Sequence, residues 1–242
     1  MLKSTFWTQR RFTGIILILG CVLYIAAVGF MPRDTQGNFM VTLPARAALL
    51  LIAAQPSLFQ WSISLFIGGT IVTPLGFALL TRLLWDAGDR IFSQLALITS
   101  LFGAALLVIY AALFLGISPL AAQETARTGV VPGYYLPFNS TTQPLFVMYT
   151  ILTFSALAVY GGAVLSTRVL PHWVGWLAIV YGLLGLVSAG FVGGNVPPLV
   201  HYLLPMVMGI LLLLQQSQLP IGNHHEEAST AASPAPVAGG KQ

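Results

Sequence analysis

Charged residues are scarce in this 242-residue sequence: 7% are Asp, Glu, Lys or Arg, whereas 57% are hydrophobic. Soluble domains typically contain about 25% charged residues. Ten basic and six acidic side chains cannot cover the surface of a water-soluble globule of this size, and the mean hydropathy of +0.86 agrees. The composition therefore excludes a soluble enzyme, a nucleic-acid-binding protein and a disordered protein, and it predicts that the lipid bilayer surrounds most of the chain.

Reactive and metal-binding side chains are also few. The single cysteine, Cys21, excludes an intrachain disulfide and a cysteine metal cluster. His172 and His201 begin successive antiparallel apolar segments, so they would lie about 25 Å apart and cannot share a haem; we interpret both as residues of the membrane interface. No Gly-x-Ser-x-Gly motif surrounds Ser166, which argues against an intramembrane serine protease. We therefore expect no catalytic residue, no cofactor and no metal site.

Six segments are apolar over about 20 residues, the length that a helix needs to cross the hydrocarbon core. They cover about residues 12–31, 57–81, 91–116, 144–167, 172–192 and 198–216, and no charged residue lies well inside any of them. The sequence predicts an all-α integral membrane bundle of six transmembrane helices within residues 1–216. The first segment is longer than the apolar core of a signal peptide, which has about 7–15 residues, so we expect it to be retained.

The remaining segment, residues 217–242, becomes rich in Ala, Pro, Ser and Gly. Such a composition cannot bury enough apolar surface to fold, so we expect a disordered cytoplasmic tail. The tail contains the four potential metal ligands His224 to Glu227 in a row. Adjacent residues of a flexible chain rarely form a preformed metal site, so we interpret them as solvated.

The placement of Lys and Arg indicates the orientation. If the N-terminus is cytoplasmic, six basic residues lie near the cytoplasmic ends of the spans: Lys3, Arg10, Arg11, Arg82, Arg90 and Arg168. The outer loops then carry three: Arg33, Arg46 and Arg127. Because short cytoplasmic loops are enriched in Lys and Arg, we expect both termini inside, in a bacterial cytoplasmic (inner) membrane.

Two outer segments contain short helix signals. The apolar run Ala47–Ala54 is too short to cross the membrane, so it predicts an interfacial or re-entrant helix. Between the third and fourth spans, residues 117–143 are expected to form a loop. Within it, Ser118 is the predicted N-cap of a short helix, Pro119 lies in its first turn, and Gly129 ends it.

The densest group of charges lies between the second and third spans, from Arg82 to Arg90. Arg82 with Asp86, and Asp86 with Arg90, have the i,i+4 spacing of ion pairs on a helix, and Gly88 supplies a turn. An alternative is that Asp86 and Asp89 hold a metal ion with a phosphate substrate. We interpret the group as a structural corner.

The strongest pattern consists of small residues at helical spacing. In the fifth span they are Gly175, Ala178, Gly182, Gly185, Ala189 and Gly193, and in the third span Ser93, Ala96, Ser100 and Gly103. Membrane helices use such stripes to bring their backbones close together. We therefore predict that the fifth span packs against the third span, or else against a second subunit. Pro74 and Pro205 are expected to bend the second and sixth spans.

The stretch 166–177, Ser-Thr-Arg-Val-Leu-Pro-His-Trp-Val-Gly-Trp-Leu, is followed by Gly-Leu-Leu-Gly at 182–185. Together with residues 74–82, Pro-Leu-Gly-Phe-Ala-Leu-Leu-Thr-Arg, it resembles a family of bacterial six-span inner-membrane proteins of unknown function. The resemblance extends to the order and spacing of all six spans. It implies no activity, cofactor or catalytic residue.

Two functions fit these features best, ahead of an enzyme, which would need reactive groups on one face of the membrane. The absence of buried charge favours a non-enzymatic membrane protein that packs against partner membrane proteins, such as an accessory subunit, or against a second copy of itself. The alternative is a transporter of a small molecule or lipid, which requires polar residues that converge on a cavity near the midplane, beside Pro74 and Pro205. The lipid bilayer is the expected surroundings in both cases, and no nucleic-acid partner is expected.

Overall fold

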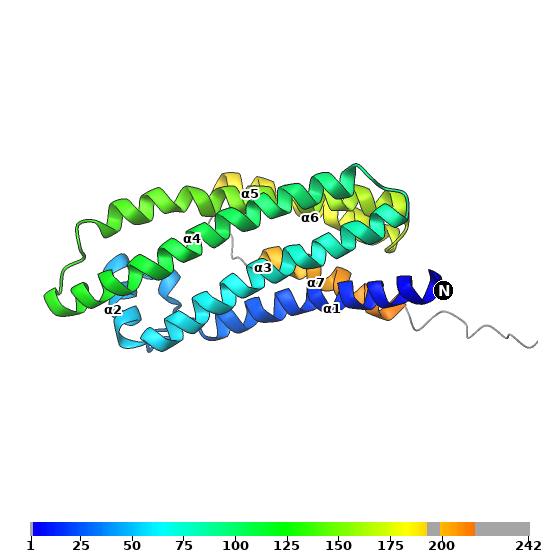
Figure 1. Ribbon diagram of the computed structural model, residues 1–242. Coiled ribbons are helices and arrows are strands. Elements are labelled where there is room, and N and C mark those ends of the chain that lie inside the picture. The colour runs from blue at the N-terminus through cyan, green and yellow to red at the C-terminus, as the bar shows by residue number, and fades with distance from the viewer. Residues whose placement is uncertain (1, 193–198, 216–242) are drawn as a thin grey trace, which may run out of the picture.

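The computed structural model describes residues 2–192 and 199–215, and these residues are almost entirely helical (Figure 1). The elements are α1 (Leu2–Gly29), the 3-10 helix η1 (Met40–Thr42), α2 (Ala45–Ala54), α3 (Pro56–Asp86), α4 (Phe92–Thr128), α5 (Tyr135–Thr167), α6 (His172–Val192) and α7 (Leu199–Leu214). The long helices form an elongated bundle. The predicted all-helical fold is confirmed for the part of the chain described.

Five of these helices are long and apolar enough to cross a membrane: α1 from Thr8, then α3, α4, α5 and α6. Helix α7 has 16 residues, a length of about 24 Å that is shorter than a typical hydrocarbon core of about 30 Å. The chain is therefore a multi-pass helical membrane protein by the length and composition of its helices. Both ends of the expected sixth span, the tail 217–242 and Gly193 lie outside the described residues.

The expected loop over residues 117–143 is wrong for most of its length, because only residues 129–134 lie between α4 and α5. Helix α4 is 37 residues long and continues through Ser118 and Pro119 to Thr128. Its C-cap is Gly129, which adopts the left-handed conformation with φ 74°. Gly129 is thus a helix terminator, as predicted, but Ser118 is buried inside the helix and is not an N-cap. The helix continues because its extension packs against α2 and the start of α5, burying residues such as Ala121 and Ala122.

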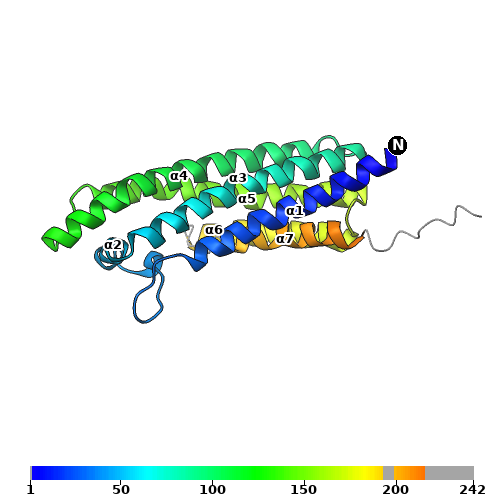
Figure 2. The ribbon, with the colours of Figure 1, turned by 60° about the horizontal axis from the view of Figure 1, so that its bottom comes forward.

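A short helix crosses one end of the bundle (Figure 2). Helix α2 includes the run Ala47–Ala54, so the prediction of a short helix there is confirmed. It ends before Pro56, which occupies the first turn of α3, where the missing N–H of proline is harmless. We refer to this end as the α2 end, and to the opposite end, which holds the N-terminus and the α3–α4 turn, as the Gly88 end.

The predicted pairing of the two small-residue stripes with each other is wrong. Helix α5 lies between α4 and α6 and packs against both. A Cβ built on Gly182 of α6 would lie 2.6 Å from the carbonyl oxygen of Phe154 in α5. On α4, a Cβ on Gly103 would lie 3.3 Å from Leu152 Cβ, also in α5. The described members of both stripes are buried, but their neighbour is α5, whose small residues include Ala158 and Gly161.

Candidate functional site

The helices form two groups of three. The first group, α1, α3 and α7, is held by the contacts of α1 with α3 and with α7. The second group, α4, α5 and α6, is held by the contacts of α5 with its two neighbours. The groups meet mainly along α3 and α4, with a few contacts of α5 with α3 and α7.

Glycines allow the helices of each group to approach closely. A Cβ on Gly14 of α1 would lie 2.7 Å from the carbonyl oxygen of Gly209 in α7, and one on Gly69 of α3 would lie 3.0 Å from that of Gly20 in α1. In the second group, Gly182 of α6 and Gly103 of α4 make the close contacts with α5 described above. Among glycines of the described helices, every such contact below 3.4 Å joins helices of the same group. Each group is therefore tightly packed within itself.

A small internal cavity of about 20 Å³ lies between the two groups. It is lined by Thr70, Thr73, Pro74 and Phe77 of α3, Ser100 and Ala104 of α4, Tyr149 and Thr153 of α5, and His201 and Tyr202 of α7. This volume is enough for about one water molecule. Seven of the ten lining residues carry a hydroxyl or an imidazole, although the larger part of the lining surface is apolar.

The polar side chains of this lining lie among aromatic rings. His201 is only 2% exposed, and its ring centroid lies 5.0 Å from that of Tyr149 and 4.6 Å from that of Phe154. The hydroxyls of Tyr202 and Thr70 are 3.3 Å apart, and the Tyr202 ring stacks on Tyr24 at 4.4 Å. The interpretation of His201 as an interface residue is therefore wrong, because α7 inserts it between α3 and α5.

On the Gly88 side of the cavity, the two groups are joined by a polar contact inside an apolar layer. The hydroxyls of Tyr160 in α5 and Thr81 in α3 are 2.9 Å apart, and the Tyr160 hydroxyl also donates to the carbonyl oxygen of Phe77 at 3.2 Å. The Thr81 hydroxyl donates to the carbonyl oxygen of Ser93 in α4 at 3.3 Å. Phe77 and Tyr160 stack with their centroids 4.8 Å apart. This end of the interface between the groups is closed.

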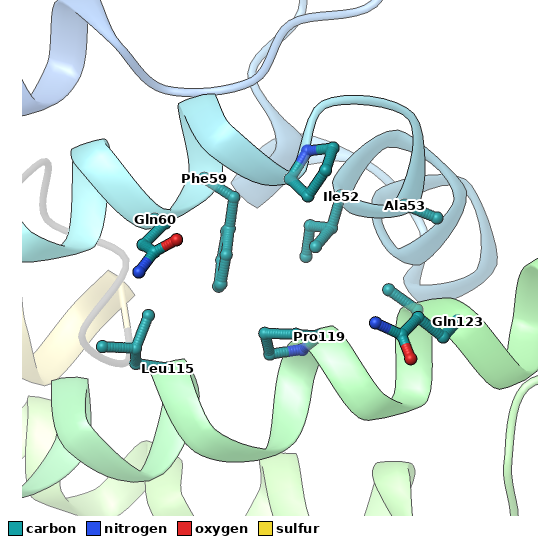
Figure 3. Close-up of a pocket in the computed structure, with 9 residues that line it drawn as sticks. Ile52, Ala53, Phe59, Gln60, Leu115, Pro119 and Gln123 are labelled. Atoms are coloured by element: carbon teal, nitrogen blue, oxygen red, sulfur yellow. The ribbon is translucent and has the colours of Figure 1, made fainter.

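A larger pocket of about 340 Å³ lies at the α2 end, again between the groups (Figure 3). It is lined by Ile52 and Ala53 of α2, Pro56, Phe59 and Gln60 of α3, and Leu115, Pro119, Ala122 and Gln123 of α4. Figure 3 shows Gln60 and Gln123 at opposite ends of the pocket, on facing helices. Seven of the nine lining residues are apolar, and the other two place an amide at each end of the pocket.

A row of aromatic rings separates the pocket from the internal cavity. Successive centroids lie 5.0–6.0 Å apart along Phe59, Phe114, Tyr110, Phe146, Tyr149 and His201. The first ring lines the pocket and the last two line the cavity. The two spaces are thus distinct, and this row of neighbouring rings runs from the lining of one to the lining of the other.

The charged corner has a structural explanation. Arg82 Nε and Asp86 Oδ2 are 3.4 Å apart, which confirms that ion pair, and Gly88 has a φ of 109° at the turn. Arg90 lies 5.7 Å from the ring of Trp85 rather than pairing with Asp86. Asp89 Oδ2 accepts a hydrogen bond of 2.7 Å from the backbone N–H of Ser93, and so satisfies a donor in the first turn of α4 that has no partner within the helix. Within residues 2–192 and 199–215, no group of three His, Cys, Asp or Glu is placed to hold a metal.

Near the α2 end, the carboxylate of Asp34 also accepts hydrogen bonds from the backbone. Asp34 Oδ1 accepts hydrogen bonds from the N–H groups of Gln36 and Asn38 at 2.9 and 2.8 Å, and Oδ2 accepts one from the Asn38 side chain. The bonds from Asn38 lower the pKa of Asp34. Asp34 therefore holds the turn between α1 and η1 and stays charged while it does so.

Sequence reasoning missed the convergence of Thr70, Tyr149, Tyr202 and His201, because these residues come from three separate helices. Each of them alone is typical of helix packing in membranes. The signal that was available is the co-occurrence of buried tyrosines with Pro74 on a neighbouring span, which is too weak to identify a site without the helix arrangement.

Comparisons of the chain with protein-family models, with curated proteins and with solved structures find no match. The resemblance to a bacterial six-span family therefore stays a prediction. Function has to be argued from the geometry described above.

Proposed function

We propose that this protein is a transporter of a small molecule, in which the two three-helix groups move relative to one another around the internal cavity. The observation that carries the proposal is the convergence of polar side chains from α3, α4, α5 and α7 on one cavity between the groups. This arrangement, beside Pro74, is the one that distinguishes a transporter from an accessory subunit. Transporters commonly move one rigid bundle against another around such a site.

The packing supports such a movement. The close backbone contacts lie within the groups, so each group can move as a unit. At the Gly88 end the groups are linked by the contacts of Tyr160 with Thr81 and Phe77, whereas at the α2 end the pocket already separates α3 from α4. The described conformation is thus closed at one end and loosely packed at the other.

The proposal includes six spans, with α7 as the sixth. Helix α7 runs antiparallel to α1 over most of its length: Tyr202 stacks on Tyr24, Cys21 Sγ lies 3.5 Å from Met206 Sδ, and Gly209 faces Gly14. Its last described residues therefore lie near the Gly88 end, where the N-terminus also lies. With the excess of Lys and Arg at that end, this supports both termini in the cytoplasm of a bacterium and the α2 end on the outer side of the inner membrane.

Cysteine accessibility tests the proposed movement. In a Cys21→Ala background, Ser100→Cys places a thiol on the internal cavity, and Leu107→Cys places one on the same helix, fully buried but not at a cavity. A cavity of about one water molecule cannot admit a charged methanethiosulfonate reagent. Ser100 is itself only 7% exposed, so efficient labelling of Ser100→Cys in membrane vesicles indicates that the groups separate.

We expect Ser100→Cys to be labelled about tenfold faster than Leu107→Cys, which corresponds to opening that costs about 1.4 kcal/mol less at the cavity. Measuring both rates in right-side-out and inside-out vesicles reports which end opens. Equal, negligible rates for the two variants would show a static bundle, and the transporter proposal would be wrong.

The accessory-subunit function stays a prediction. Helix α6 lies at the edge of the bundle with α5 as its main neighbour, and its other side carries exposed Trp176, Leu184 and Phe191. Lipid or a partner helix would cover this side equally well. A cross-linker at Leu184 that joined the chain to one stoichiometric membrane partner would favour the accessory function.

A further inference from the structure

We propose that the pocket at the α2 end binds an uncharged amphiphile that enters from the outer leaflet of the bilayer, with the amides of Gln60 and Gln123 bonded to its polar head. This inference rests on the transporter proposal for its role, because it names the class of molecule transported. The pocket itself is a separate observation from the internal cavity.

The size and lining of the pocket define the body of the ligand. A volume of about 340 Å³ lies at the small end of the range of ligand pockets, about 300–1,000 Å³. Phe59, Ile52 and Leu115 present rings and branched chains to the space, and Pro119 presents its ring. These surfaces fit a hydrocarbon chain or a small ring system.

The charges define the head of the ligand. None of the nine lining residues is charged, and an ionised group placed among apolar side chains without a partner is strongly disfavoured. A glutamine amide both donates and accepts hydrogen bonds, so Gln60 and Gln123 match hydroxyl, ester or carbonyl groups. A phosphate or carboxylate head would find no cation in the lining. The ligand is therefore neutral.

The surroundings define where the ligand comes from. Next to the lining residues, Trp61 of α3 and Leu120 of α4 are each 61% exposed. We infer that these exposed apolar residues face the lipid, so that the rim of the pocket joins the lipid-facing surface of α3 and α4. A ligand dissolved in the bilayer can reach the pocket sideways without passing through water.

The aromatic row connects this pocket with the proposed transport route. Phe59 lines the pocket, Tyr149 lines the internal cavity, and the rings of Phe114, Tyr110 and Phe146 fill the distance between them. Rotation of these rings would join the two spaces along the interface between the groups. The ligand would therefore bind first in this pocket, on the outer side, and then move inward to the internal cavity.

Photolabelling tests the site directly. The full chain in phosphatidylcholine nanodiscs is irradiated with a diazirine-bearing monoacylglycerol, and labelled peptides are identified by mass spectrometry. We expect labelling to concentrate on α2, residues 56–60 and residues 115–123. Unlabelled glyceryl monooleate should compete, whereas ionised oleate at the same concentration should not. Glycerol should also fail to compete, because the ligand comes from the bilayer rather than from water.

Two adjacent alanines of α2 provide a matched pair. Ala53 lines the pocket, whereas Ala54 is exposed and does not. Ala53→Trp should fill the pocket and abolish the concentrated labelling, and Ala54→Trp should leave it unchanged. Equal labelling of the two variants, or labelling spread evenly over all lipid-facing helices, would refute the site.

A second variant addresses the head group and does not depend on the folding of Ala53→Trp. Gln60→Leu combined with Gln123→Leu removes both amides and replaces two exposed side chains with others of similar size. Loss of two hydrogen bonds should weaken monooleate competition about thirtyfold. Unchanged competition would overturn the role of the amides. If labelling behaves as expected while Ser100→Cys stays unreactive, the binding site stands and the transporter proposal fails.

Discussion

Replacing Gly182 with alanine should destabilise the bundle, although alanine is the better helix former. A Cβ at this position would lie 2.6 Å from the carbonyl oxygen of Phe154, 2.7 Å from Ala158 Cβ and 2.8 Å from Ala158 N. Two of these atoms belong to the backbone of α5 and cannot rotate away, so α6 has to shift from α5. Overpacking of this kind costs about 1–3 kcal/mol.

The same helix contains its own control. Gly190 is exposed, and a Cβ built on it would meet nothing within 4 Å. Gly190→Ala should therefore be neutral, or stabilising by up to about 1 kcal/mol through helix propensity. Leu183→Phe enlarges a side chain that is 53% exposed on the next position of the helix, and we expect little effect from it.

Thermal unfolding in mild detergent, followed by circular dichroism, measures the difference. For a chain of this length, 1–3 kcal/mol corresponds to roughly 2–12 °C in Tm. Gly182→Ala should melt lower by that amount, and Gly182→Leu lower still. If Gly182→Ala and Gly190→Ala melt at the same temperature, the close contact of α6 with α5 is not what the glycines provide, and the reasoning about the packed groups fails.

Three further changes test other parts of the structure. Tyr160→Phe removes the hydroxyl that contacts Thr81 and should lower stability by about 1 kcal/mol. It should also speed the labelling of a cavity cysteine from the cytoplasmic side. Unchanged labelling would contradict the proposed closure. Asp89→Ala removes the acceptor for the N–H of Ser93 in the first turn of α4 and should cost about 1 kcal/mol. Asp89→Asn keeps an acceptor oxygen and should retain most of the stability, and the melting temperatures of the two variants test this. Reporter fusions after Gln123 should read as periplasmic and one after Gly88 as cytoplasmic, and a cytoplasmic signal at Gln123 would contradict the proposed orientation.

Several features of the protein follow from local sequence alone. Apolar runs without charge determine membrane helices because a helix is the form in which a single segment satisfies its own backbone hydrogen bonds in lipid. Gly129 ends α4 and Gly88 makes the α3–α4 turn because both positions have positive φ, which glycine adopts without strain. Arg82 and Asp86 pair because four residues bring side chains to the same face of a helix. The small-residue stripe of α6 likewise predicts that another helix packs closely against it.

The tertiary structure decided which helix packs against the small-residue stripe of α6 and where the cavities lie. The stripe on α6 fits any partner with a matching surface, and α5 has that surface in Ala158 and Gly161. Ser118 looked like an N-cap, but packing of the α4 extension against α2 outweighed the local signal. His201 looked like an interface residue, but α7 places it beside Tyr149 at the boundary between the two groups. Such contacts depend on residues far apart in the chain, and local spacing carries no information about them.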